Sequence, residues 1–295
     1  NIPANQFRIY HLGKEVAVLA STDAIMKPGD FFMIFGQENQ GELDHTLFKD
    51  QTDLFNPYYS MFTSKSCYTI TWSANPGAAR ISTINNDLSA PVPKEEYFTN
   101  TERKVFSDTI SKRAIGTGSF IRSPMYDAGQ GFATEKNTFL TVPINFTGAF
   151  IGPNVPKAQI RFWMAGKGED DAAHSCDISL DGVVVENEKF SGNKVHESRL
   201  ALDHETLKQN YNLGITVDRT RNEFDLVSLS FIEWTYQKTY KFQNARFARM
   251  VIESSPIRKY LELEDFDGGA EIGVYDVTNS IFLTSTRENS GIYKI

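Results

Sequence analysis

"CDISLDGVVV", residues 176–185, joins an alternating strand to a hairpin turn. Apolar and polar residues alternate up to Leu180, so the apolar side chains share one face of an extended chain. Asp181 and Gly182 follow at once, and an Asp-Gly pair suits the type I′ turn that connects two antiparallel strands. The stretch therefore predicts a β-hairpin.

Strand patterns recur on both sides of this hairpin. Aromatic residues make up 13% of the 295 residues, and large rings suit pleated, half-buried surfaces. Many short strands without long helices between them predict antiparallel sandwiches. One helix is expected, over residues 202–212, with Asp203 as its cap. Further strands are expected within residues 7–12, 15–21, 31–36, 67–72, 139–146, 158–166, 213–219, 224–236, 245–253, 259–266, 272–277 and 281–287. We predict an all-β fold of two β-sandwich modules, the second jelly-roll-like, with at most one short helix.

A shift in composition separates the two expected modules. Residues 85–104 hold two prolines and many charged residues, so they bury little and suit a linker. We predict an N-terminal β module over residues 1–90, a linker over 91–104, and a jelly-roll-like β-sandwich over 105–295.

The net charge of −7 narrows the set of partners. An acidic chain repels phosphate backbones, and no stretch rich in Lys and Arg counters this, so nucleic acid is not expected as a partner. No apolar run approaches the roughly 18 residues of a membrane helix, so no membrane-spanning segment is expected. The sequence starts at Asn1 without a Met or a signal peptide, which predicts a mature or trimmed chain.

The sequence contains two cysteines, Cys67 and Cys176, and neither has the setting of a nucleophile. A cysteine hydrolase needs its thiolate beside a base such as histidine. His174 shares a strand face with Cys176, so a small cysteine hydrolase using Cys176 and His174 is one hypothesis. Packing is the favoured interpretation of both thiols, because free cysteines mostly behave as small buried apolar residues. No catalytic residue is therefore predicted.

Two acidic stretches and three tryptophans offer binding chemistry. "GEDD", residues 168–171, and "DFDGG", residues 265–269, resemble fragments of calcium loops but lack the spacing of an EF-hand, and turn chemistry explains both. No metal site or cofactor is predicted, with a structural calcium ion as the alternative. Trp72, Trp163 and Trp234 lie in alternating strands, where filling a core is favoured. An exposed aromatic row would instead indicate a carbohydrate-binding module or an adhesin.

Six longer stretches occur in an order that carries information about the family. They are "FRIYHLGKEVAV" (7–18), "KPGDFFMIFGQENQGELDHTLF" (27–48), "NPYYSMFTSKSCYTITW" (56–72), "YDAGQGFATE" (126–135), "AHSCDISLDG" (173–182) and "IGVYDVTNS" (272–280). Their order resembles the N-terminal region of gingipain-like cysteine peptidases, and is most similar to the signal peptidases (sortases) of the type IX secretion system of Bacteroidetes. The chain departs from the family pattern at "GQGF", residues 129–132, where "GEGW" is usual.

The resemblance implies a region that is not itself an enzyme. In this family the catalytic domain follows the stretch matched by residues 272–280 and supplies its own His and Cys, and no residue here matches that pair. The implied role is a propeptide-like or substrate-docking region of a secreted peptidase, at the cell surface or associated with the outer membrane. Its partners would be a downstream catalytic domain or export substrate proteins. A strand edge suits such docking, but the sequence identifies no binding residue.

Overall fold

The computed structural model describes residues 2–75, 77–89, 91–111, 126, 128–166, 172–220 and 222–295. Strands dominate this part of the chain, and its helical elements are short 3-10 turns, which confirms the predicted all-β class. None of them is long and apolar enough to cross a bilayer as a helix. The turns are η1 (Ala4–Gln6), η2 (Asp44–Leu47), η3 (Gln51–Asp53) and η4 (His204–Thr206).

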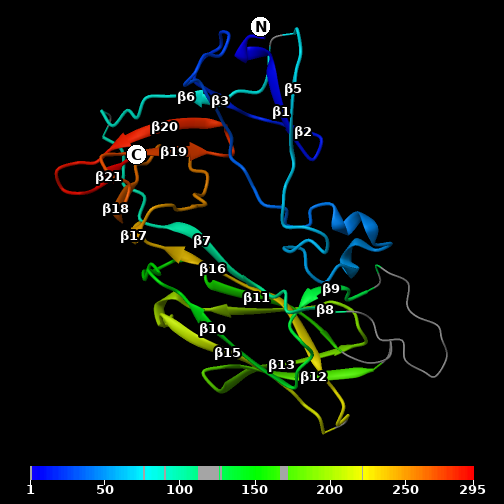
Figure 1. Ribbon diagram of the computed structural model, residues 1–295. Helices are drawn as coiled ribbons and strands as arrows, with labels where there is room; N and C mark the ends of the chain where they lie inside the picture. The colour runs from blue at the N-terminus through cyan, green and yellow to red at the C-terminus, as the bar shows by residue number, and fades with distance from the viewer. Residues whose placement is uncertain are drawn as a thin grey trace.

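The centre of the molecule is a sandwich of two four-stranded antiparallel sheets (Figure 1). The first sheet has the order β10 (Phe139–Asn145), β15 (Asn210–Val217), β12 (Ala173–Leu180) and β13 (Val183–Ser191). The second has the order β14 (His196–Leu202), β11 (Ala158–Gly166), β16 (Val227–Lys238) and β7 (Phe98–Val105). From β10 to β16 the chain changes sheet at every connection except the β12–β13 hairpin, which gives the jelly-roll-like character expected of this region.

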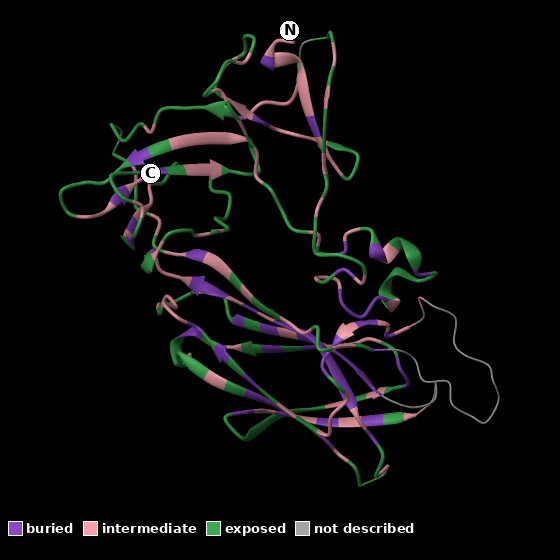
Figure 2. Ribbon diagram, viewed as in Figure 1, coloured by how far each residue is buried: buried purple, intermediate pink, exposed green. Residues whose placement is uncertain are grey.

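The core of the sandwich follows from the alternation along its strands. In β11 the residues Ala158, Ile160 and Phe162 are fully buried, while their neighbours point outward. In β12 the buried set is His174, Cys176, Ile178 and Leu180, as the alternation predicted. Figure 2 shows that the buried residues gather along the strands of the two facing sheets. The buried face of each sheet is therefore encoded by simple period-two patterning.

The predicted hairpin after Leu180 is confirmed. Leu180 and Val183 are paired across β12 and β13. Asp181 and Gly182 both have positive φ, 51° and 82°, as a type I′ turn requires.

Most strands outside the sandwich form a second part, which we call the terminal lobe. It consists of strands β1 to β6 and β17 to β21, so both ends of the chain contribute to it (Figure 1). Its sheets have the orders β2-β1-β5, β3-β4, β19-β20-β6 and β17-β18-β21. A further two-stranded sheet, β8-β9, lies beside the sandwich. The bounds are β1 (Phe7–His11), β2 (Lys14–Val16), β3 (Leu19–Ala20), β4 (Phe32–Met33), β5 (Tyr68–Trp72), β6 (Ser82–Thr83), β8 (Thr109–Ser111), β9 (Gly131–Ala133), β17 (Lys241–Ala245), β18 (Glu262–Phe266), β19 (Glu271–Asp276), β20 (Ile281–Thr286) and β21 (Tyr293–Lys294).

Contacts between residues far apart in sequence join the N-terminal and C-terminal segments of the terminal lobe. Strand β6 pairs in parallel with β20 through Ser82 and Ile281. The side chain of Asn86 donates to the carbonyl oxygen of Lys294 at 2.7 Å. A small core of seven buried residues then connects the lobe to the sandwich through Phe98 of β7. Its members are Phe98, Tyr240, Phe242, Leu263, Phe266, Ile272 and Tyr293.

Three expectations meet different structures. The strand expected within residues 245–253 does not form, since β17 ends at Ala245 and the next strand, β18, begins at Glu262. The helix predicted over residues 202–212 is wrong, because the segment runs from the last residue of β14 through the single turn η4 into β15. The Asp203 side chain makes no capping hydrogen bond, and Asn210 pairs with Asn145 of β10 instead. Half of the segment expected to be a linker, residues 98–104 of 91–104, belongs to β7 of the second sheet. The division of the chain into modules stays a prediction.

Candidate functional site

The hypothesised pair of Cys176 and His174 lies inside the sandwich. Both residues are buried, and His174 Nδ1 is hydrogen-bonded to Asp225 Oδ1 at 2.6 Å. The Nε2 atom of His174 faces Gly166 of β11, where an added Cβ would lie 2.2 Å from it. Burial, followed by the charges of Asp225, Asp177 and Glu188, raises the pKa of the Cys176 thiol to about 12. A thiol that stays protonated near neutral pH is a poor nucleophile, so this geometry does not favour the hydrolase hypothesis.

Cys67 lies on the surface. The expectation that it packs in a core is wrong, because its side chain is exposed. It stands just before β5, whose pairing with β1 begins at Tyr68, and the preceding residues 62–65 are exposed as well. The alternation that continues through β5 does not bury Cys67, because the strand lies at the edge of a small sheet.

The three tryptophans occupy three different environments. Trp234 is buried, as expected of a core residue, and its Nε1 donates to the Asn145 carbonyl at 2.8 Å. Trp163 is half-buried and donates to Glu197 Oε2 at 2.8 Å. Trp72 is 61% exposed, against the expectation that it fills a core. The three rings therefore do not form a common row for stacking on a polysaccharide.

The acidic stretches provide no metal centre in the described residues, where no group of three or more His, Cys, Asp or Glu side chains is placed to hold an ion. In the stretch 265–269, Asp267 accepts a hydrogen bond from Arg246 at 2.8 Å, and Gly269 has a positive φ of 78°. The Asp267 contact is an ion pair, and Gly269 belongs to a turn. The other stretch, residues 168–171, lies outside the described residues.

Asn56 fastens the N-terminal segment to the sandwich, a role that the sequence did not reveal. Its side chain is fully buried, and Nδ2 donates to three carbonyl oxygens. These belong to Phe132 at 2.9 Å, Phe106 at 3.2 Å and Ser230 at 3.4 Å. Its Oδ1 accepts the backbone N–H of Tyr58 at 3.1 Å. We call residues 54–60 the anchor segment.

The glycine-rich stretch that begins at residue 126 lies against the anchor segment. The Phe55 N–H donates to the Gln130 carbonyl at 3.0 Å, and the Gly129 N–H donates to the Asp53 carbonyl at 2.9 Å. Gly131 has a φ of 155°, and a Cβ there would stand 2.9 Å from the backbone nitrogen of Asn56. Two of the stretches that carry the family resemblance therefore meet in space, 70 or more residues apart in sequence.

Tyr58 inserts into a charged cluster on the outer face of the second sheet. Its ring lies 4.8 Å from the Phe231 ring, edge to face, and the Arg103 guanidinium carbon sits 3.4 Å from its centroid. Arg161 donates to the Tyr58 hydroxyl, and both arginines pair with Glu233. The cluster covers this face of β16, whereas the first sheet has an open outer face with exposed residues such as Phe139 and Val184.

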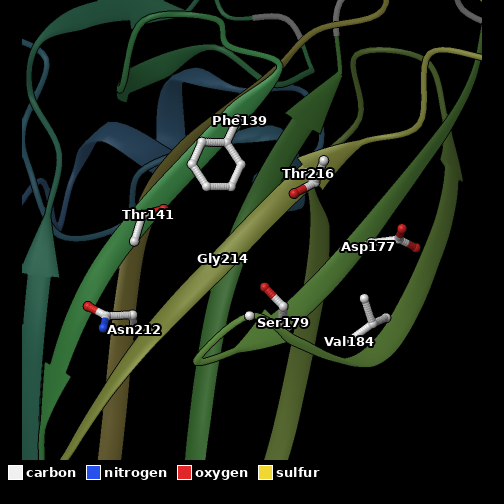
Figure 3. A pocket seen from close by; sticks show the side chains of 9 residues that line it. Phe139, Thr141, Asp177, Ser179, Val184, Asn212, Gly214 and Thr216 are labelled. Atoms are coloured by element: carbon white, nitrogen blue, oxygen red, sulfur yellow. The ribbon is translucent and has the colours of Figure 1, made fainter.

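A hollow of about 310 Å³ lies on that open face of the first sheet (Figure 3). Gly214 of β15 stands at its centre, paired with Thr141 of β10 on one side and Ser179 of β12 on the other. Because Gly214 has no side chain, the surrounding residues form a ring around an empty middle, as Figure 3 shows. The other lining residues are Phe139, Asp177, Gly182, Val184, Asn212 and Thr216.

Strand β5 presents an open edge of the terminal lobe. It ends the sheet order β2-β1-β5, so one side of its backbone has no neighbouring strand in the described part of the chain. Tyr68, Ile70 and Trp72 share one face, and Ile70 and Trp72 are 58% and 61% exposed. Across β1, Ile70 is paired with Ile9, which is buried. The edge therefore combines free backbone groups with an apolar row.

Comparison with known proteins gives a likeness of fold. No family model matches the sequence, and no curated protein matches it. Among solved structures, dimeric latent PorU from Porphyromonas gingivalis matches 98% of this chain with a TM-score of 0.57 and 10% sequence identity. The chain spans 27% of the length of that PorU chain. At this identity the match shows a shared fold alone.

A carbohydrate-binding module is also similar in part. The CBM36-1 domain of a multidomain xylanase, from the hindgut metagenome of Trinervitermes trinervoides, matches 46% of this chain and 96% of its own. The TM-score is 0.29 at 14% identity. A likeness this weak carries no argument about the function of this chain.

Proposed function

We propose that this chain is a non-catalytic region of a secreted, gingipain-like cysteine peptidase of the type IX secretion system, located at the cell surface or outer membrane. Its role is to dock onto a catalytic domain and restrain it. The observation that carries this proposal is the fold likeness to PorU, which extends over 98% of this chain but involves only 27% of PorU. A match of that kind is expected of one region of a larger protein.

Two further observations support the proposal. The order of the sequence stretches resembles the N-terminal region of gingipain-like peptidases, and two of those stretches meet where Asn56 contacts Gly131 and Phe132. The PorU structure is that of a latent form. A rigid β region that covers part of a catalytic domain is one physical route to latency, because it needs no chemistry of its own.

We assign the docking to the β5 edge. An extended segment of the catalytic domain adds a strand beside Tyr68–Trp72, so that its backbone groups bond to the open edge. Ile70 and Trp72 then become buried, and each fully buried large apolar side chain stabilises a contact by about 2 kcal/mol. The occupant is a strand-forming segment with apolar side chains at alternate positions.

The test uses the purified chain and the catalytic domain of a gingipain-like peptidase from the same bacterium. Cleavage of a fluorogenic peptide is followed while the chain is added, and complex formation is measured by calorimetry. The proposal predicts a saturable complex and a fall in cleavage rate. The double variant Ile70→Ser with Trp72→Ser should weaken the complex by at least about tenfold, because two apolar anchors are lost.

The matched control is Val183→Ser, which changes a side chain that is 67% exposed on the sandwich. This variant should bind as the unchanged chain does. No complex and no change in cleavage would discard the docking role. A complex that both variants form equally well would discard the β5 edge as its site, and binding to an export substrate protein alone would replace restraint by substrate docking.

A further inference from the structure

We propose that the hollow on the outer face of the first sheet binds a short, uncharged saccharide. This site is separate from the β5 edge and does not depend on the peptidase proposal. Its volume of about 310 Å³ is at the lower end of the range for ligand sites, which run from roughly 300 to 1,000 Å³. A hollow of this size has room for one or two sugar rings.

The hollow exists because Gly214 lies between two strands that carry side chains. Thr141 and Ser179 flank it in register, and a Cβ at Gly214 would stand 2.4 Å from the Ser179 hydroxyl oxygen. Any other residue at this position would fill the floor and displace Ser179. The empty centre is therefore a property of one glycine in the middle of an otherwise regular strand.

The lining has the chemistry that recognises sugars. Hydroxyls of Thr141, Ser179 and Thr216 and the amide of Asn212 offer donors and acceptors around the floor (Figure 3). The Phe139 ring is 59% exposed at one end of the hollow, where it offers an apolar face for the C–H groups of a sugar ring. Hydroxyl groups and a C–H face are the two features that a saccharide presents together.

Asp177 supplies the one charge in the lining, and it is held in place. Asn187 Nδ2 donates to Asp177 Oδ1 at 2.8 Å, so the carboxylate is held in one orientation before a ligand binds. Hydrogen bonds to a charged acceptor are stronger than those between neutral groups. The lining contains no Lys, Arg or His, and the whole chain has a net charge of −7. Phosphorylated sugars and uronic acids are therefore disfavoured, and neutral sugars fit.

The test begins with an array of neutral, N-acetylated and uronic-acid glycans, followed by calorimetry with the free mono- or disaccharide of each hit. We expect hits among neutral or N-acetylated glycans. Phe139→Ala and Asp177→Ala should each weaken binding by at least about tenfold, because one removes the stacking ring and the other a charged acceptor. Val185→Ala, on the neighbouring strand and outside the lining, should bind as the unchanged chain does.

Three outcomes would overturn the inference. They are an array without hits among neutral and N-acetylated glycans, a preference for uronic acids, and binding that neither variant weakens. Circular dichroism of each variant shows whether a lost affinity comes from lost folding. If Phe139→Ala unfolds, Asp177→Asn keeps the side-chain shape and should still lower the affinity. The Ile70→Ser and Trp72→Ser double variant should leave sugar binding unchanged, which separates this site from the docking edge.

Discussion

The sandwich has a larger buried apolar core than the terminal lobe. The sandwich buries them between two facing sheets, with a core that includes fully buried residues of β11, β12, β15 and β16. The terminal lobe has shorter strands and a small core that it shares with Phe98 of β7, and it leaves Ile70 and Trp72 of β5 more than half exposed. Figure 2 shows the same contrast in the colours of the two parts.

The difference suggests different roles for the sandwich and the terminal lobe. A region that places its apolar side chains in its own core gains stability, whereas a region that leaves them at a strand edge keeps them for a partner. Under the proposed function, the sandwich is the support and the terminal lobe carries the docking edge. The predictions below test this contrast.

The largest effect is expected in the sandwich core. Phe162→Ala removes a fully buried ring from β11 and should lower the free energy of unfolding by about 3–5 kcal/mol. Phe247→Ala removes a ring that is 75% exposed in the terminal lobe, and it should change the free energy of unfolding by less than about 0.5 kcal/mol. Urea unfolding of both variants checks this. Equal losses would mean that the two parts do not differ in how they use apolar residues.

The next effect concerns the anchor segment. Asn56→Ala leaves three carbonyl oxygens without their side-chain donor and should cost about 1–3 kcal/mol. Asn56→Asp should cost at least as much, because its carboxylate would face the same carbonyl oxygens. Hydrogen exchange of residues 54–60 should become faster in both variants. Unchanged exchange there would show that Asn56 does not fasten the segment.

A smaller effect should appear as a dependence on pH. The folded Cys176 thiol keeps its proton up to a pKa of about 12, whereas the unfolded thiol loses it near its ordinary value of 9.0. Below pH 9 both states hold the proton, so Cys176 adds no pH dependence. Between pH 9 and 12 only the unfolded state loses the proton, so the folded state becomes less stable as the pH rises, by roughly 1 kcal/mol per pH unit.

The measurement compares the unchanged chain with Cys176→Ala by urea unfolding at about pH 8 and about pH 10, with reductant present. The stability of the unchanged chain should fall more between these values than that of the variant. Burial raises the pKa of Tyr236 and Tyr240 as well, but both tyrosines are present in both proteins, so their contribution cancels in the comparison. An equal fall would show that the Cys176 thiol is not held protonated by the sandwich.

The smallest effect is expected at the docking edge. Ile70→Thr and Trp72→Thr should each change the free energy of unfolding by less than about 0.5 kcal/mol, since both side chains are more than half exposed. Thermal unfolding of the isolated chain checks this. A large loss at either position would mean that β5 already uses these side chains within the molecule.

The sequence predicted those parts of the fold that depend on local patterns. Alternation along β12 and the Asp181-Gly182 turn identified the hairpin, because burial of one face and positive φ are local requirements. The same local logic failed at residues 202–212, where pairing of β15 with β10 outweighs any helical preference. It failed at Cys67 as well, because alternation does not show whether a strand lies at an edge.

The candidate sites depend on contacts that no local pattern contains. Asn56 bonds to carbonyl groups that lie 50, 76 and 174 residues further along the chain. The hollow needs Gly214 to lie between Thr141 and Ser179, which only the register of three strands determines. Such positions look ordinary in the sequence, and they acquire a role only when the sheets assemble.

The most direct test of the central claim is hydrogen exchange of the chain with and without the gingipain-like catalytic domain. If the terminal lobe carries the docking edge, amides of Tyr68–Trp72 exchange more slowly in the complex. The exchange of amides in the first sheet of the sandwich does not change. A complex that slows exchange in β10, β12 and β13 and leaves Tyr68–Trp72 unchanged would contradict the account.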